Sequence, residues 1–261
     1  MTTTAVDDYV EFCTFLRKLT GIDLSQYKRA QMERRLRSFY ANKGVDSLTA
    51  TFERLRSDPV HLEELLDRIT INVSQLWRNP EQWEVIKKTL LPELAEQGQI
   101  RAWSAGCSYG AEAYTLATLC HVVAPHNRVS IQGTDIDKRM VARARLGLFS
   151  EDDARTAPDN LLRIGFDRVD GGWRAKLDLR KTTRFDPGDL LQMQLRRASY
   201  DLILCRNTVI YFAEPIRDEL HARLAGALRP GGFLVIGSTE RVSSATVLGL
   251  SMQHPFIYRK S

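Results

Sequence analysis

Apolar side chains in the first quarter of the chain recur at intervals of three and four residues, the spacing of an amphipathic helix. Four such stretches cover residues 8–21, 26–44, 47–58 and 59–70. The first two end at Gly21 and Gly44, and glycine commonly closes a helix. Because no long β-branched run interrupts them, the pattern predicts a small all-α N-terminal domain over residues 1–70.

From about Val85 onward, short apolar runs alternate with helical stretches. The runs at 100–106, 129–135, 200–207 and 231–238 have the length and composition of strands. This alternation predicts an α/β fold, a doubly wound and mainly parallel sheet with helices on both faces, over residues 85–261. The pattern breaks between Gly147 and Gly188, where Asp170-Gly171-Gly172 favours a hairpin. We therefore expect a small inserted antiparallel β subdomain at about residues 150–187, and a linker at 71–84.

The composition is that of an ordinary soluble protein, with 43% hydrophobic and 26% charged residues among 261. No apolar run is long enough to span a membrane, and the first residues lack the basic-then-apolar order of a signal peptide. The four cysteines form no C-x-x-C, and the five histidines have no ligand spacing. We expect a cytoplasmic protein with reduced thiols, no structural metal and no direct membrane insertion.

One short segment, Gly106-Cys107-Ser108-Tyr109-Gly110, matches the G-x-S-x-G elbow of serine hydrolases. His254 is the only well-placed partner histidine, and no separate oxyanion loop is visible. In the alternative interpretation, Gly106 and Gly110 let a cofactor approach the backbone near a helix N-terminus. A phosphate loop is excluded, because Gly110 is followed by Ala111-Glu112 and no lysine.

The second predicted strand ends at Asp135, about 25 residues after the glycine loop, where an acid can bind both ribose hydroxyls of an adenosine. The dinucleotide fingerprint G-x-G-x-x-G is missing. In the first turn of the following helix, Glu112 would repel phosphates and attract a cation. This combination favours S-adenosylmethionine, which carries an ammonium and a sulfonium charge.

Several motifs in one order extend this interpretation to nearly the whole chain: TINVSQLWRN, IRAWSAGCSYGAEAYTLA, TDIDKRMVARARLG, FDPGDLL, DLILCRNTVIYF and LRPGGFLVIGSTE. With them the chain resembles the CheR family, the chemotaxis receptor glutamate O-methyltransferases. The resemblance implies a class I (Rossmann-like) methyltransferase domain with an inserted β subdomain, preceded by a small all-α domain. It also implies S-adenosyl-L-methionine as cofactor, S-adenosyl-L-homocysteine as product, and methylation of glutamates for adaptation in chemotaxis.

The candidate residues have three roles, of which the resemblance implies cofactor contact and receptor contact, and side-chain chemistry suggests the third. The expected cofactor contacts are Asn72, Ser74, Arg78, Gly106, Gly110, Glu112, Asp135, Asp189, Leu190, Arg206 and Asn207. Arg78 and Tyr211 are candidates for orienting the substrate carboxylate, although Tyr211 could simply pack as a buried aromatic. The basic residues Arg34, Arg35 and Arg37 would meet the acidic methylation helices of chemoreceptors.

The chain departs from the usual glycine loop of the family, G-C-S-T-G-E-E-P-Y. Tyr109, Ala111 and Ala113 replace threonine, glutamate and proline, and we expect the bulk of Tyr109 to narrow the methionine end of the pocket. Asp189 stands where the family usually has asparagine. These departures keep open a non-catalytic, cofactor-binding adaptor of the same fold.

A nucleic-acid methyltransferase is a further alternative, since a basic strip can also hold nucleic acid. Against it, the chain has no aromatic-and-basic stacking platform. The [DNS]-P-P-[YF] tetrapeptide of amino-methylating enzymes is also missing, and Arg206-Asn207-Thr208-Val209 occupies its place. We therefore expect no nucleic-acid partner.

Overall fold

The computed structural model describes residues 7–45, 47–70 and 72–261. Residues 1–6 and 46 of the predicted helical domain, and residue 71 of the predicted linker, lie outside the described residues. The described chain forms two compact units. One contains the residues up to Asn72 together with Tyr211–Ile216, and the other contains Val73–Ile210 and Arg217–Ser261.

The first unit is helical, as the periodicity predicts. Its elements are α1 (Asp8–Thr20), η1 (Leu24–Gln26), α2 (Arg29–Ala41), η2 (Thr49–Thr51), α3 (Phe52–Ser57) and α4 (Pro59–Thr70). Gly21 closes α1 in the left-handed conformation, with φ at 84° and its N–H donated to the Arg17 carbonyl. The apolar face of α2 supplies Met32, Leu36, Phe39 and Tyr40 to the core.

The segment Tyr211–Ile216 returns to this helical unit, although we predicted it within the methyltransferase domain. Tyr27 and Phe212 form an antiparallel bridge, and their ring centroids are 5.0 Å apart. The Lys28 N–H donates to the Tyr211 carbonyl at 2.9 Å. The helical unit is therefore built from two distant pieces of chain, a pairing that local periodicity does not reveal.

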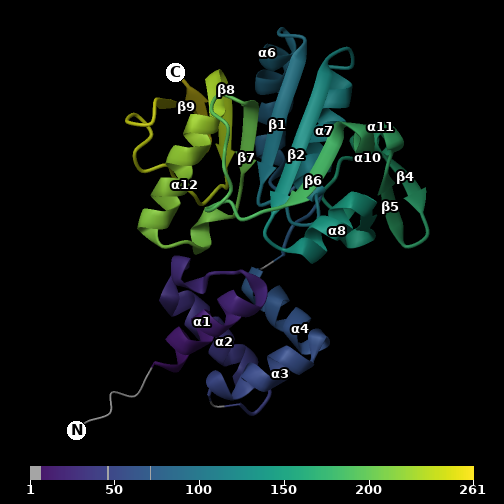
Figure 1. The fold of residues 1–261 in the computed structure, drawn as a ribbon. Helices are drawn as coiled ribbons and strands as arrows, with labels where there is room; N and C mark the ends of the chain where they lie inside the picture. The colour runs from purple at the N-terminus through teal and green to yellow at the C-terminus, as the bar shows by residue number, and fades with distance from the viewer. Residues whose placement is uncertain (1–6, 46, 71) are drawn as a thin grey trace. The chain divides into compact units, whose positions relative to one another are not determined.

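The second unit is built on a seven-stranded sheet in the order β6-β2-β1-β7-β8-β10-β9 (Figure 1). The strands are β1 (Gln99–Ala105), β2 (Arg128–Asp135), β6 (Thr183–Pro187), β7 (Tyr200–Cys205), β8 (Leu228–Ile236), β9 (Leu250–His254) and β10 (Ile257–Lys260). The first five strands of that order are parallel, and β10 pairs antiparallel with both β8 and β9. The doubly wound prediction is confirmed.

Helices cover both faces of this sheet. They are α5 (Pro80–Val85), the π-helical η3 (Ile86–Leu90), α6 (Leu91–Ala95), α7 (Ala111–Val123), α8 (Lys138–Leu146) and α12 (Glu214–Ala227). In Figure 1, α12 lies in front of the sheet, whereas α6 and α7 lie behind β1 and β2. The parallel strands end at one edge of the sheet, which is where such folds bind their ligands.

The inserted β subdomain is present, with shifted limits. A small sheet in the order β3-β5-β4 joins β3 (Leu148–Ser150), β4 (Phe166–Val169) and β5 (Gly172–Ala175), all antiparallel. With α9 (Glu151–Ala154), α10 (Asp159–Gly165) and α11 (Leu177–Thr182), it spans Leu148 to Thr182. The predicted limits of about 150–187 were wrong at the far end, because residues 183–187 form β6 of the large sheet. Only Phe185 of β6 is buried, so this strand has no apolar run.

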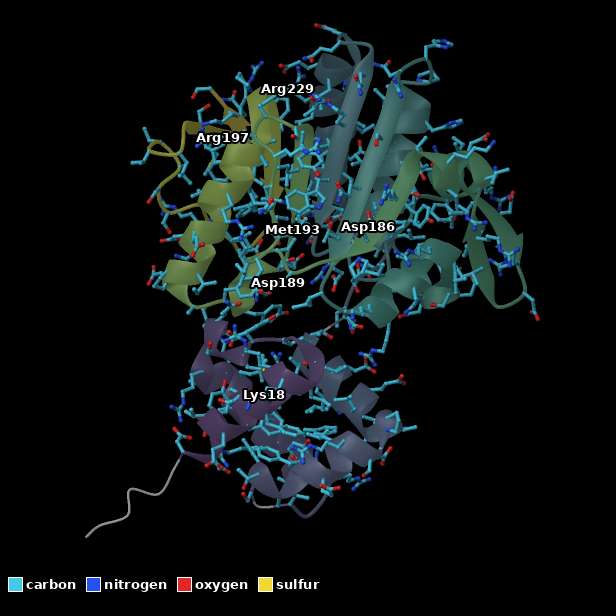
Figure 2. All side chains as sticks on the ribbon, in the orientation of Figure 1. Lys18, Asp186, Asp189, Met193, Arg197 and Arg229 are labelled. Carbon is cyan, nitrogen blue, oxygen red and sulfur yellow. The ribbon has the colours of Figure 1, made fainter. Side chains whose placement is uncertain are left out.

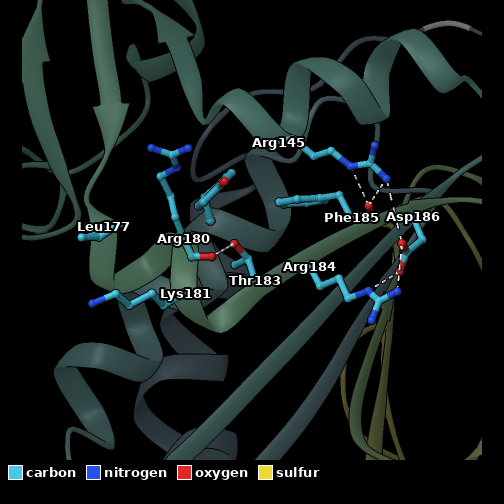
Figure 3. Close-up of a pocket in the computed structure, with 9 residues that line it drawn as sticks. Arg145, Leu177, Arg180, Lys181, Thr183, Arg184, Phe185 and Asp186 are labelled. Atoms are coloured by element: carbon cyan, nitrogen blue, oxygen red, sulfur yellow. Dashed lines mark hydrogen bonds and ion pairs between the residues drawn. The ribbon is translucent and has the colours of Figure 1, made fainter.

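Charged side chains protect β6, which is an edge strand of the large sheet. Arg145 on α8 donates to the Phe185 carbonyl from Nε at 2.9 Å and from Nη2 at 2.7 Å. Figure 3 shows this pair beside Arg184, which binds Asp186 at 2.8 Å, and a cavity of about 450 Å³ lies alongside. Occupied carbonyls and charges at an edge disfavour pairing with another chain.

Candidate functional site

The glycine loop follows β1 in a conformation that requires glycine at its first and last positions. Gly106 and Gly110 have φ values of 80° and 87°, in the left-handed region. A Cβ on Gly106 would lie 2.4 Å from Thr208 Oγ1, in the loop after β7. The N–H groups of Gly106 and Cys107 both donate to the Thr134 carbonyl, at 2.8 and 3.0 Å. The loop is therefore fixed to the ends of two neighbouring strands.

Asp135 ends β2 directly beside this loop. Its Oδ2 accepts the Ser108 N–H at 2.7 Å, and its Oδ1 accepts the Asp137 N–H at 2.9 Å. Burial raises the pKa of Asp135, and the two N–H donors oppose that rise. A carboxylate has about four acceptor positions, more than these two bonds use, so Asp135 can also accept from hydroxyls of a ligand.

The hydrolase interpretation fails on strand order. His254 lies on β9, and β7, β8 and β10 stand between β9 and β1, whose end carries Ser108. At the usual strand spacing this separation is about 19 Å. A histidine base must lie within hydrogen-bond reach of its nucleophile, so Ser108 and His254 form no catalytic pair.

Glu112 and Arg206 form a buried ion pair at the start of α7. Glu112 Oε2 lies 3.3 Å from Arg206 Nη1, and Glu112 Oε1 accepts the Ser104 hydroxyl at 2.7 Å. Burial raises the pKa of Glu112, and the Arg206 charge opposes this rise. Burial likewise lowers the pKa of Arg206. The arrangement offers a carboxylate in a dry environment, which attracts a cationic ligand group.

Arg206 also connects this ion pair to α5 and to the segment that precedes it. Its Nε donates to Gln82 Oε1 at 2.8 Å, and its Nη2 donates to the Arg78 carbonyl at 2.6 Å. A second acceptor for Nη2 is Asn79 Oδ1 at 3.3 Å. The Arg78 side chain acts on Glu112 as well, since its positive charge lowers the Glu112 pKa. The predicted linker thus contributes to the same site.

Glu240, a residue with no predicted role, organises the loop after β7. Its carboxylate accepts the N–H groups of Gly237 at 2.6 Å, Asn207 at 3.2 Å and Val209 at 3.1 Å. Asn207 adopts a φ of 58°, which this carboxylate helps to hold. The available signal was an acid just beyond the carboxyl end of a parallel strand, the same signal that identified Asp135.

The Tyr109 ring occupies a different place from the one we predicted. It is buried at 3% exposure, packs near Phe149 at a centroid distance of 6.2 Å, and lies under the Arg143 guanidinium. Its hydroxyl contacts the Ser74 carbonyl and Asp153. The ring is therefore held by the insertion and α8, and its bulk is accommodated there.

The remaining predicted contacts occupy several places in the structure. The Asn72 amide donates to Thr70 Oγ1 at 2.8 Å within the helical unit, and Arg78 Nη1 donates to the Val73 carbonyl at 2.7 Å. Asp189, which follows β6 (Figure 2), closes a turn by accepting the Leu191 N–H at 2.8 Å, and the neighbouring Leu190 is buried.

The two candidates for orienting the substrate carboxylate belong to different units. Tyr211 lies in the helical unit, where its ring faces the Arg35 guanidinium at 5.6 Å, whereas Arg78 belongs to the sheet unit. Their joint action stays a prediction.

Comparison with known proteins decides the family. Residues 72–254 match "CheR methyltransferase, SAM binding domain", and residues 7–70 match "CheR methyltransferase, all-alpha domain". The chain belongs to the CheR family. A chemotaxis protein methyltransferase of Listeria innocua is 33% identical over 97% of each chain. Chemotaxis protein methyltransferase 1 of Pseudomonas aeruginosa is 30% identical over 91% of each chain.

The CheR match confirms S-adenosylmethionine as the cofactor, and the described residues fit it. Two buried carboxylates, Glu112 and Asp135, suit a ligand with positive charge and ribose hydroxyls. Gly106 leaves no room for a side chain beside the loop. Within the described ranges, no three His, Cys, Asp or Glu side chains are grouped so that they could hold a metal, and no helix is long and apolar enough to cross a membrane.

The raised carboxyl pKa values predict a pH dependence of cofactor binding. Glu112 and Asp135 take up protons at a higher pH than ordinary carboxyls because burial raises their pKa values, and protonation removes the negative charge that we predict the cofactor to meet. Affinity should therefore be full near neutral pH and fall on acidification, with a midpoint above the ordinary pKa values of aspartate and glutamate carboxyls. Calorimetric titration from pH 8 to about pH 4, with folding followed by circular dichroism, measures this fall in affinity. A constant affinity across the range would contradict the assignment.

Proposed function

We propose that this chain transfers the methyl group of S-adenosylmethionine to glutamate side chains in the methylation helices of chemoreceptors, forming γ-glutamyl methyl esters. The observation that carries the proposal is the buried Glu112–Arg206 pair beside Asp135, in a chain that matches CheR methyltransferases along nearly its whole length. We also infer a cytoplasmic location, since that is where such receptor helices lie.

The reaction needs no general base. A glutamate side chain has an unperturbed pKa of about 4.3, so at neutral pH it is already a nucleophile. The bound cofactor supplies a methyl group activated on a positively charged sulfur. The protein contributes by holding the reactants in line and by excluding water, which stabilises the separated ions and so retards their reaction.

The proposed roles of the site residues follow from their chemistry. Glu112 meets the cationic methionine end, and Asp135 binds the ribose hydroxyls. Arg206 holds Glu112 in place, and Asn72, Ser74, Asn207, Asp189 and Leu190 are proposed to complete the pocket. Arg78 and Tyr211 are proposed to orient the substrate carboxylate through single contacts, because a tight bidentate clamp would weaken the nucleophile.

The proposed receptor surface lies on α2, and its three arginines differ. Arg37 binds Asp8 at 2.8 Å and Glu33 at 2.7 Å, so its charge is already paired. Arg35 is half-buried and donates to the Ile69 carbonyl at 3.4 Å. Arg34 is exposed and lines a cavity of about 310 Å³ together with Arg68 of α4. Arg34 is therefore the best candidate for attracting an acidic helix.

Charge reversal at Arg34 tests whether this residue attracts the receptor without contributing to cofactor binding. Arg34→Glu should lower the methylation rate of a receptor fragment about tenfold at low salt while leaving cofactor affinity unchanged, because surface charge mainly steers encounter. The effect should shrink at high salt, where exposed charges are screened. Lys18→Glu makes the same charge change on α1 and serves as the control. Equal rates for Arg34→Glu and the control would remove Arg34 from the receptor surface.

The function itself is tested by offering purified receptor cytoplasmic fragment, DNA and RNA in parallel with S-adenosylmethionine labelled in its methyl group. The proposal expects label in the receptor fragment alone. Label in nucleic acid would identify a nucleic-acid methyltransferase, and cofactor binding without any transfer would identify a non-catalytic adaptor.

A further inference from the structure

Tyr109 lies at the centre of a buried hydrogen-bond network that the family's usual threonine could not form. Its hydroxyl contacts Asp153 Oδ1 at 2.8 Å and also the Ser74 carbonyl. Both partners are acceptors, so one phenolic proton serves them together. A threonine hydroxyl sits one bond beyond Cβ and would end far short of either partner. The network is therefore a property of this chain's altered glycine loop.

Asp153 is held from several sides at once. Its Oδ2 binds Arg143 Nη2 at 2.7 Å and accepts the Ser150 N–H at 2.9 Å. The Arg143 guanidinium in turn lies 3.8 Å from the centre of the Tyr109 ring, a cation–π distance. The hydroxyl thus meets a carboxylate that has little freedom to move.

The other end of the network is the irregular segment at residues 74–78. The Leu76 N–H donates to the Asp153 carbonyl at 2.8 Å, and the Leu76 carbonyl accepts the Thr156 hydroxyl at 2.8 Å. Trp77 adopts a φ of 54°, an uncommon value for a bulky residue, and its N–H donates to Thr115 Oγ1 at 3.1 Å. A segment without helix or strand bonds depends on such anchors for its conformation.

The same segment leads directly to the cofactor site. Its last residue, Arg78, gives its carbonyl to Arg206, and Arg206 pairs with Glu112. The backbone of residues 74–78 therefore joins the Tyr109 contact at Ser74 to the Arg206 contact at Arg78, and so to the ion pair at the start of α7.

We propose that Tyr109, acting with Asp153, is a positioning residue that fixes residues 74–78 beside the glycine loop and thereby sets the affinity for S-adenosylmethionine. The inference rests on the proposed function only through the assignment of Arg78, Glu112 and Arg206 to the cofactor site. Cofactor affinity is measured without any methyl acceptor, so failure of receptor methylation and failure of this inference are distinguishable.

The decisive variant is Tyr109→Phe, which keeps the ring and removes the shared proton. The Ser74 carbonyl then loses its donor, so the segment should loosen. We expect calorimetry to give about tenfold weaker S-adenosylmethionine binding. The KM for the cofactor should rise in parallel, while kcat and the KM for the receptor fragment stay within about twofold. Hydrogen exchange of the Leu76 and Trp77 amides should accelerate.

The matched control is Tyr200→Phe. The Tyr200 hydroxyl donates to Gln132 Oε1 at 2.7 Å, a bond between β7 and β2 of the same sheet unit. Its removal should leave cofactor affinity and the exchange of both amides unchanged. Unchanged affinity and unchanged exchange in Tyr109→Phe would overturn the inference.

A second variant covers the case in which Tyr109→Phe does not fold. Arg143→Met keeps an aliphatic chain over the ring and removes the charge that holds Asp153. It should weaken cofactor binding about threefold with the same acceleration of amide exchange. Wild-type affinity and exchange in a folded Arg143→Met protein would equally overturn the inference.

Discussion

Asp135→Ala should weaken S-adenosylmethionine binding about a hundredfold, which corresponds to about 2.7 kcal/mol. The substitution removes the acceptor proposed for two ribose hydroxyls and frees the Ser108 N–H that fixes the glycine loop. Hydrogen bonds to a charged group contribute about 1.5–3 kcal/mol each, so a loss of this size is expected from the carboxylate alone. Isothermal calorimetry on the purified chain measures the change in Kd.

Asp137→Ala is the control for this variant. Asp137 is also buried and lies two residues further on, but its carboxylate caps α8 by accepting the Arg139 N–H at 3.0 Å. Loss of a helix cap should cost about 1 kcal/mol of folding stability and leave the Kd unchanged. If Asp135→Ala bound the cofactor as tightly as Asp137→Ala, the assignment of Asp135 to the ribose would be wrong.

Arg206→Met should both destabilise the fold and remove most cofactor binding. The substitution leaves the Glu112 carboxylate buried without its cation, and breaking a buried pair in this way costs about 3–5 kcal/mol. For a domain of this size we expect the melting temperature to fall by about 10 °C. Because burial then raises the Glu112 pKa further, ionisation of Glu112 opposes folding, and the variant should lose stability as the pH rises.

The double variant Arg206→Met/Glu112→Gln tests the cause of that loss. A neutral amide needs no counter-charge, so the double variant should recover a large part of the melting temperature. Cofactor affinity should stay low, since the carboxylate proposed to meet the cationic end is gone. A melting temperature near wild type in the single variant, or no recovery in the double, would contradict the account.

The sequence predicted the sheet where its strands are buried on both faces. β1, β7 and β8 read as apolar runs because helices cover them on two sides. β6 gave no such signal, since Phe185 is its only buried residue. The return of Tyr211–Ile216 to the helical unit also left no local pattern in the sequence. The bridge that holds this segment joins Tyr27 to Phe212, which are 185 positions apart along the chain.

The residues of the candidate site likewise include some that the sequence could predict and others that it could not. Glu112 and Asp135 were predictable, because a helix N-terminus and a strand's carboxyl end fix their places in this fold. Gln82 was not, since its bond to Arg206 spans 124 residues. Glu240 follows the carboxyl end of β8, so its place could be predicted, but its backbone N–H partners could not, because any residue type supplies an N–H group. The place of Tyr109 depends on Asp153 in the insertion, 44 residues away.

The most direct test of the central claim is to identify the methylated group on a receptor cytoplasmic fragment. The account predicts that methyl label from S-adenosylmethionine enters the fragment as an ester that mild base releases as methanol. It also predicts no labelling when the modified glutamates are replaced by glutamine. Label that resists base, or that persists in the glutamine-substituted fragment, would contradict the claim that this chain is a protein-glutamate methyltransferase.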